Sequence, residues 1–198
     1  NDARLAALIK ARPGVRVPGA WDGFELTVRA ILGQQVSVKA ATTLAGRIAK
    51  RYGDKVTLPT SLQGRERVAL DRLFPAPATL AHARFNNIGL VGSRAATIRQ
   101  LARGVADGDI DFDAAQDPSG FCEQLKTIKG IGDWTSEYVA MRALKNPDAF
   151  PASDLGLLKA MGDEVATPRE LRQRAESWRP WRAYAALLLW GSLPGSGG

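Results

Sequence analysis

An aspartate at the start of an apolar segment is the side chain best suited to chemistry in this sequence. Asp154 lies in "DAFPASDLGLLKAMG", where Pro151 and Ser153 indicate a loop that leads into a helix. The free amides of a helix N-terminus favour a negative charge. An ionised carboxylate there suits a reaction that builds positive charge on a sugar, as glycosidic cleavage does. The simpler alternative, that Asp154 or Ser153 only caps the helix, stays open.

A glycine turn in "KTIKGIGDWTSEYVA" precedes that segment. A helix, then Gly130-Ile131-Gly132, then a second helix is the outline of a helix-hairpin-helix. The glycines leave the turn amides accessible to a phosphate, and Lys126 and Lys129 add positive charge. Such a site grips a nucleic-acid backbone without reading its sequence. A plain corner between two helices fits the same residues.

Aromatic residues follow the turn at helical spacing. Trp134 and Tyr138 are four residues apart, so they share one face of the helix that begins at Asp133 or Trp134. Packing in a core is the usual role of such a pair.

The composition indicates a folded, basic protein. Its 198 residues carry a formal net charge of +7, which favours a polyanionic partner, with nucleic acid first. With Cys122 as the single cysteine, the chain cannot form an internal disulfide or ligate an iron–sulfur cluster. No apolar run reaches the roughly 20 residues of a membrane span. The chain begins at Asn1 without Met, as a fragment or processed product would, and we expect a cytoplasmic protein associated with the nucleoid.

Helical periodicity runs through almost the whole chain, without a convincing alternating strand, and predicts an all-α fold of about ten helices. Asp22 and Ser37 are expected to cap two of these helices, and Gly53 to end one. The expected segments are 2–11, 22–35, 37–53, 76–83, 93–108, 118–128, 133–144, 153–162, 167–178 and 179–191.

Four segments together resemble a known family. "ILGQQVSVKAATTLAGRIAKRYG", "IKGIGDWTSEYVAMRAL", "DAFPASDLGLLKAMG" and "WRPWRAYAALLLW" are similar, in this order, to the AlkA-type 3-methyladenine DNA glycosylases II. These form part of the helix-hairpin-helix–Gly/Pro…Asp superfamily, and the same segments resemble the glycosylase part of Ada–AlkA fusions. The resemblance covers nearly the whole chain.

The resemblance implies an enzyme that flips alkylated purines, of the 3-methyladenine and 7-methylguanine type, out of double-stranded DNA and hydrolyses their N-glycosidic bond. Asp154 falls on the catalytic aspartate, and Trp134, Tyr138 and Trp190 fall on the aromatic lining of the base pocket. Their faces would attract a cationic base. Trp134 stands where strand-cleaving members carry a nucleophilic lysine, so we expect a monofunctional glycosylase. Trp178 and Trp181 are interpreted as structural.

The resemblance also assigns contacts with DNA. The predicted DNA-binding residues are Gln34, Gln35, Lys126, Lys129, Gly130, Ile131 and Gly132. Gln35 replaces the family's leucine wedge and is expected to fill the space that the flipped nucleotide leaves. Backbone carbonyls near Lys126, Ile128 and Ile131 would bind a structural Na⁺ or K⁺. No cofactor is required, and no iron–sulfur cluster is expected.

Two helical lobes with a cleft between them are expected. One lobe would run from 23 to 146 and end with the hairpin, and the other would combine 1–22 with 147–198. The α/β domain that begins AlkA is missing from this sequence, so an upstream α/β or Ada-like domain is expected, in a protein that acts as a monomer.

Three alternatives remain open at this level. The first is a non-catalytic helix-hairpin-helix module that only binds DNA. The second is a glycosylase of the same fold that acts on oxidised or mismatched bases. The third is a basic helical bundle that binds protein or RNA.

Overall fold

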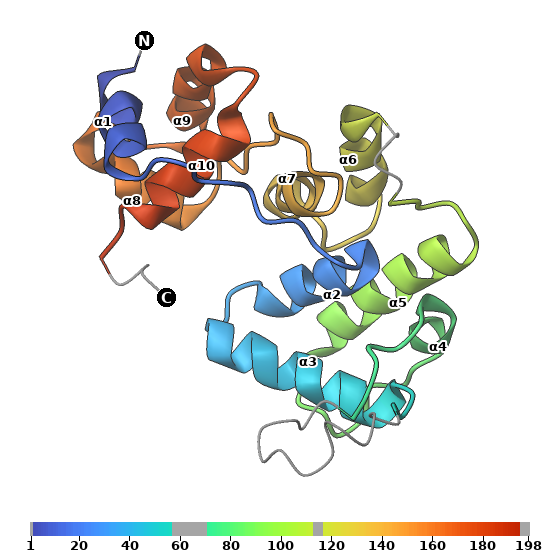
Figure 1. Ribbon diagram of the computed structural model, residues 1–198. Coiled ribbons are helices and arrows are strands. Elements are labelled where there is room, and N and C mark those ends of the chain that lie inside the picture. Colours follow the sequence, from blue (N-terminus) through green and yellow to red (C-terminus); the bar gives the residue numbers. More distant parts are fainter. Residues whose placement is uncertain (1, 57–70, 113–116, 195–198) are drawn as a thin grey trace. The chain divides into compact units, whose positions relative to one another are not determined.

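The described part of the protein is built from helices (Figure 1). The structure is a computed structural model that describes residues 2–56, 71–112 and 117–194. Within these ranges its only strand-type pairing is an isolated antiparallel bridge between Lys55 and Arg72, so the predicted all-α class is confirmed. The α-helices are α1 (Ala3–Ala11), α2 (Gly23–Gly33), α3 (Val38–Tyr52), α4 (Pro77–Ala81), α5 (Gly92–Ala106), α6 (Pro118–Lys126), α7 (Asp133–Arg142), α8 (Leu155–Met161), α9 (Pro168–Ala175) and α10 (Arg182–Gly191).

Capping side chains start several helices where the sequence predicts. The amide of Glu25 donates to Asp22 Oδ1 at 2.7 Å, and the amide of Ala40 donates to Ser37 Oγ at 3.2 Å. Gly53 is the C-cap of α3, in extended rather than left-handed conformation. Each cap satisfies a backbone group that would otherwise lack a partner.

The chain folds as two compact units. The first contains 2–26, 112, 117–127 and 131–194 among the described residues. In this unit α10 packs against α1 and α8, and α6 packs against α7. Trp178 is buried and donates its indole N–H to Asp2 Oδ2 at 2.9 Å, which supports the structural role expected of it. Trp181, by contrast, is 58% exposed.

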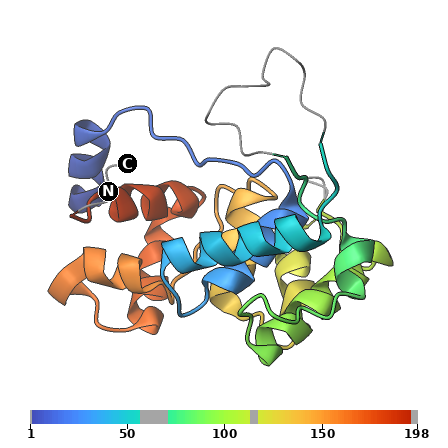
Figure 2. The same cartoon turned by 90° about the horizontal axis from the view of Figure 1, so that it is seen from below.

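The second unit contains 27–56, 71–111 and 128–130. Its α4 packs against α5, and Figure 2 shows these two helices side by side. Fully buried aliphatic side chains from several helices form its core: Ile31, Leu32, Ile48, Leu80, Ile98 and Leu101. The predicted lobe limits, 23–146 for one and 1–22 with 147–198 for the other, stay a prediction.

Among the described residues, no helix combines the length and the apolar character that a bilayer span requires.

Candidate active site and hairpin

The carboxylate of Asp154 is held by three neutral N–H donors from three helices. Asp154 is the N-cap of α8, and the amide of Leu157 donates to its Oδ1 at 2.9 Å. The indole of Trp190, on α10, donates to the same oxygen at 2.8 Å. The indole of Trp134, on α7, donates to Oδ2 at 2.7 Å. All four residues belong to the first unit. The side chain of Asp154 thus caps α8 and also accepts hydrogen bonds from two other helices.

The charge of Asp154 is not neutralised within the described part of the chain. No lysine or arginine there forms an ion pair with this carboxylate, which is partly exposed. Hydrogen bonds to N–H groups stabilise the charged form of a carboxylate and fix its orientation without cancelling its field. The site therefore presents an oriented negative charge to whatever binds beside it.

Gly156 allows the indole of Trp190 to approach this carboxylate. A Cβ at position 156 would lie 2.9 Å from Asp154 Oδ1 and 3.2 Å from Trp190 Cδ1. Glycine inside a helix is less favourable than alanine by about 1 kcal/mol. The close approach of the indole explains why a glycine stands in this first turn. Gly156 was not among the predicted site residues, although a glycine two positions after a capping aspartate is visible in the sequence.

Aromatic side chains form a row along α7. The rings of Trp134 and Tyr138 are stacked, with centroids 5.2 Å apart and planes 6° from parallel. Arg142 follows one turn later, with its guanidinium carbon 5.5 Å from the Tyr138 centroid, and Nη1 donates to the phenol oxygen at 3.2 Å. The spacing of the two aromatic residues predicts their pairing, but Arg142 was not among the predicted site residues.

The hairpin contains the tight turn that its glycines predict. Gly130 has φ +100°, in the region that favours glycine, and a Cβ there would collide with Thr97 Oγ1. The Thr97 hydroxyl donates to the Lys129 carbonyl at 2.8 Å, and the side-chain amide of Gln34 donates to the Gly130 carbonyl at 3.0 Å. Two carbonyls of the turn are thus bound by side chains of the second unit.

The start of α7 lacks a capping side chain. Gly132 is the N-cap residue, and a Cβ there would meet open space. The first-turn amides of a helix without a side-chain cap are suited to an anionic oxygen.

The two predicted phosphate-binding lysines have different surroundings. Lys126 Nζ lies 2.6 Å from a Glu123 carboxylate oxygen and 3.3 Å from Asp133 Oδ1. The hydrogen bond with Glu123 is the main cause that raises the pKa of Lys126, and the hydrogen bond with Lys126 is the main cause that lowers the pKa of Asp133. Lys129 is exposed.

The predicted wedge residue lies in the connection between α2 and α3. Gln35 is exposed and has φ +57°, which is uncommon outside glycine. Its neighbour Gln34 spans the turn, since its amide binds Gly130 while its carbonyl accepts a hydrogen bond from Arg94. Gln34 therefore positions the turn, and Gln35 is the glutamine whose side chain projects outward.

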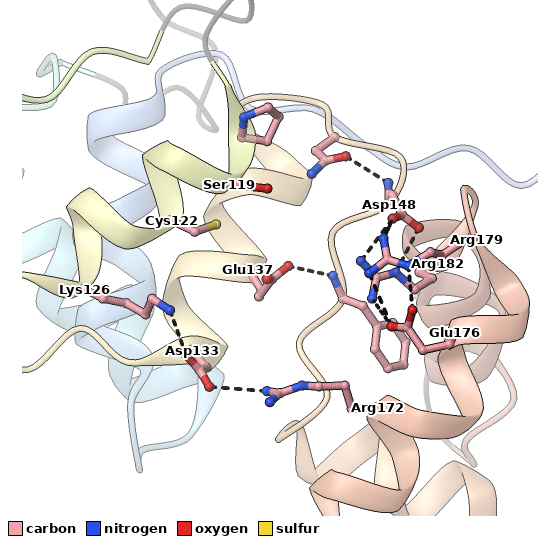
Figure 3. A pocket seen from close by; sticks show the side chains of 13 residues that line it. Ser119, Cys122, Lys126, Asp133, Glu137, Asp148, Arg172, Glu176, Arg179 and Arg182 are labelled. Carbon is pink, nitrogen blue, oxygen red and sulfur yellow. Dashed lines mark hydrogen bonds and ion pairs between the residues drawn. The ribbon is translucent and has the colours of Figure 1, made fainter.

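A polar hollow lies elsewhere in the first unit (Figure 3). It encloses about 540 Å³, and its walls carry neither Asp154 nor the stacked aromatic residues. Burial raises the pKa of the Cys122 thiol in its wall to about 12, which keeps that thiol protonated. The lining residues are Pro118, Ser119, Cys122, Lys126, Asp133, Glu137, Asn146, Asp148, Phe150, Arg172, Glu176, Arg179 and Arg182.

Carboxylates and guanidinium groups in the wall of this polar hollow neutralise each other in ion pairs. Arg182 Nε and Nη2 bind the two oxygens of Asp148 at 2.9 and 3.0 Å, and Arg182 Nη1 binds Glu176 at 3.1 Å. Arg179 also pairs with both carboxylates. In the part of the chain that the structure describes, no group of three or more His, Cys, Asp or Glu side chains is arranged to hold a metal ion.

Comparison with known proteins identifies the same family as the sequence segments. Residues 28–181 match the family model described as HhH-GPD superfamily base excision DNA repair protein. A probable bifunctional transcriptional activator/DNA repair enzyme AlkA of Mycobacterium tuberculosis is 40% identical over 97% of this chain. DNA-3-methyladenine glycosylase 2 of Escherichia coli is 37% identical over 94% of it. The chain spans only 38% and 63% of the lengths of these two relatives.

A solved structure has a similar fold. The DNA-3-methyladenine glycosidase of Bacillus halodurans superposes with a TM-score of 0.74 at 26% identity, covering 99% of this chain and 85% of that one. The resemblance drawn from the four sequence segments is confirmed.

Proposed function

Because the chain belongs to the HhH-GPD superfamily of base excision DNA repair proteins, we propose that it is a DNA glycosylase that releases alkylated purines of the 3-methyladenine and 7-methylguanine type. The observation that carries this proposal is the carboxylate of Asp154, oriented by two indoles and free of any cationic partner among the described residues. Such a group is matched to a substrate that becomes positive at the sugar.

The chemical step follows from that charge. The base is flipped out of the duplex, and the bonding electrons of the N-glycosidic bond leave with it. A purine alkylated at N3 or N7 already carries a positive charge, so it departs neutral and needs no proton. The positive charge passes to the deoxyribose, where Asp154 stabilises the oxocarbenium-like state. Water then adds to C1′ and releases its proton, leaving an abasic site.

Trp134 and Trp190 have two functions in this proposal. Their N–H groups hold the carboxylate, and their rings line the space beside it. Electron-rich rings attract a cationic base by about 1–2 kcal/mol in a desolvated site. Tyr138 contributes to the same lining through its stack on Trp134.

The reaction ends at the abasic site, because the chain has no nucleophilic amine at position 134. Strand-cleaving members form a Schiff base through a lysine there, and an indole cannot do so. Borohydride treatment of the enzyme with damaged DNA should trap no covalent complex, and a trapped complex would contradict the monofunctional assignment.

The hairpin is proposed to hold one DNA strand through its backbone amides. The uncapped start of α7 and the exposed Lys129 supply donors and charge for a phosphate. Gln35 is proposed to fill the gap left by the flipped nucleotide, so Gln35→Ala should weaken binding to DNA with an abasic analogue. A monovalent cation on the carbonyls of Lys126, Ile128 and Ile131 remains a proposal of the same kind.

Chromatography of the bases released from methylated DNA tests the function directly. We expect 3-methyladenine and 7-methylguanine in the wild-type digest and neither base with Asp154→Asn. Duplexes that contain 8-oxoguanine or uracil serve as comparison substrates. Release of those bases without the methylated ones would replace this proposal by a glycosylase for another lesion.

A further inference from the structure

Arg142 lies at the end of the aromatic row on α7 and is held there by Tyr138. Its guanidinium carbon is 5.5 Å from the ring centroid, and Nη1 donates to the phenol oxygen at 3.2 Å. These are the two ways in which a tyrosine attracts a cation, through the face of its ring and through its hydroxyl. The ring and the hydroxyl of Tyr138 both contact the guanidinium of Arg142.

No carboxylate neutralises this arginine within the described residues. Arg142 forms no ion pair there, and its Nε is buried without a hydrogen-bond partner. Arginine remains protonated in proteins. The aromatic row therefore contains a fixed positive charge with little compensation beyond the tyrosine itself.

The order of side chains along α7 places Tyr138 between its two neighbours. Trp134, Tyr138 and Arg142 follow each other at intervals of four residues, so they stack along one face of the helix. The Trp134 ring stacks on the Tyr138 ring, and the guanidinium carbon of Arg142 lies 5.5 Å from the centroid of the same ring. The positive charge of Arg142 therefore lies next to the ring on which Trp134 stacks, within one aromatic row.

We propose that Arg142 determines specificity, by reducing the preference of the base pocket for cationic over neutral alkylated purines. The inference rests on the proposed function. The guanidinium already uses the quadrupole of Tyr138, and it repels a second positive charge that approaches the same row. A neutral lesion is not repelled, so Arg142 broadens the range of bases that the pocket accepts.

Single-turnover release from two duplexes of the same sequence tests this inference. One duplex contains 7-methylguanine, which is cationic, and the other contains 1,N6-ethenoadenine, which is neutral. Arg142→Gln removes the charge and keeps a donor for the phenol, and Arg142→Met removes both. We expect the ratio of the cationic to the neutral rate to rise by about threefold to tenfold in each variant.

Two further variants control for charge and for folding. Arg142→Lys keeps the charge and should leave the ratio near its wild-type value. Lys145→Met changes the net charge by the same amount three residues further along and should also leave it unchanged. Arg142→Gln alone suffices if Arg142→Met does not fold.

An unchanged ratio in Arg142→Gln, with base release intact, would overturn the inference and leave the proposed function standing. An equal rise in Lys145→Met would also overturn it, because the effect would then come from net charge. If the wild-type chain releases neither base, the proposed function fails and the inference falls with it.

Discussion

Two sets of carboxylates in the first unit have opposite surroundings. Asp148 and Glu176, in the polar hollow, are paired with the guanidinium groups of Arg179 and Arg182. Asp154 is bound only by neutral N–H donors in the described structure. A carboxylate paired with arginine has little field left for a ligand, whereas one held by indoles and an amide keeps its charge. Of these two polar regions, the one around Asp154 is therefore suited to electrostatic catalysis.

Replacing each carboxylate by its amide should separate the two regions most strongly. Asp154→Asn keeps a side chain that caps α8 but removes the charge, so base release should fall by at least about a hundredfold while DNA binding persists. Asp148→Asn should leave the rate nearly unchanged and lower the melting temperature, because it leaves Arg182 less well paired. Single-turnover kinetics and thermal melts measure both effects. Equal losses of rate in the two variants would contradict the claim that only the carboxylate of Asp154 contributes to catalysis.

Removing one indole N–H at a time should give the next largest effect. Trp134→Phe and Trp190→Phe keep an aromatic ring but delete a hydrogen bond to a charged oxygen, so the rate should fall by about tenfold to fiftyfold. Trp178→Phe is the matched control, because it deletes an indole bond to Asp2 instead. That variant should lose stability without losing rate per folded molecule.

The readout for these indole variants includes a property that packing alone would not alter. A duplex with a pyrrolidine abasic analogue carries a positive charge near C1′, and one with tetrahydrofuran does not. The indole variants should lose affinity for the charged analogue more than for the neutral one. Equal losses for both would mean that the indoles only fill space.

Adding one methyl group at Gly156 should have a smaller effect. The new Cβ presses on Asp154 Oδ1 and on the Trp190 indole, so Gly156→Ala should reduce the rate by about fivefold through a shift of the carboxylate. Gly46→Ala is the control, since a Cβ there meets open space within α3. That control should leave the rate unchanged and raise stability by up to about 1 kcal/mol. Wild-type rates in Gly156→Ala would show that the carboxylate tolerates displacement.

Acid should lower the stability of the fold by protonating the paired carboxylates. This is the smallest of the expected effects. The hydrogen bond with Lys126 is the main cause that lowers the pKa of Asp133, and the hydrogen bond with Arg179 is the main cause that lowers the pKa of Glu176. A lowered native pKa gives stability that is present above the unfolded value of about 4 and is lost as pH falls through the native value. The melting temperature should therefore decrease as the pH is lowered below about 4.

Asp133→Asn should flatten part of this acid dependence. The change is small because Asp133 and Arg172 are half-exposed and solvent screens their attraction. Thermal melts between pH 5 and pH 2.5 measure it. A steeper loss in the variant than in the wild type would contradict the assignment.

Local features of the fold could be predicted from the sequence. The caps at Asp22, Ser37 and Asp154 and the turn at Gly130 all appear where their residue types indicated. Each depends on a side chain and a backbone group within a few positions, so the pattern is visible in a short stretch of chain. The helices, the turn and the position of the aspartate at a helix start therefore follow from short stretches of the sequence.

The surroundings of that aspartate depend on how distant helices pack together. Trp134, Asp154 and Trp190 are 20 and 36 residues apart in sequence, and only the packing of α7, α8 and α10 turns both indole N–H groups toward one carboxylate. Spacing also cannot show that Arg142 lies against Tyr138 or that Arg182 is committed to Asp148. Whether a charged side chain is neutralised depends on which distant groups the fold brings within hydrogen-bonding distance, and that is a property of the packed helices.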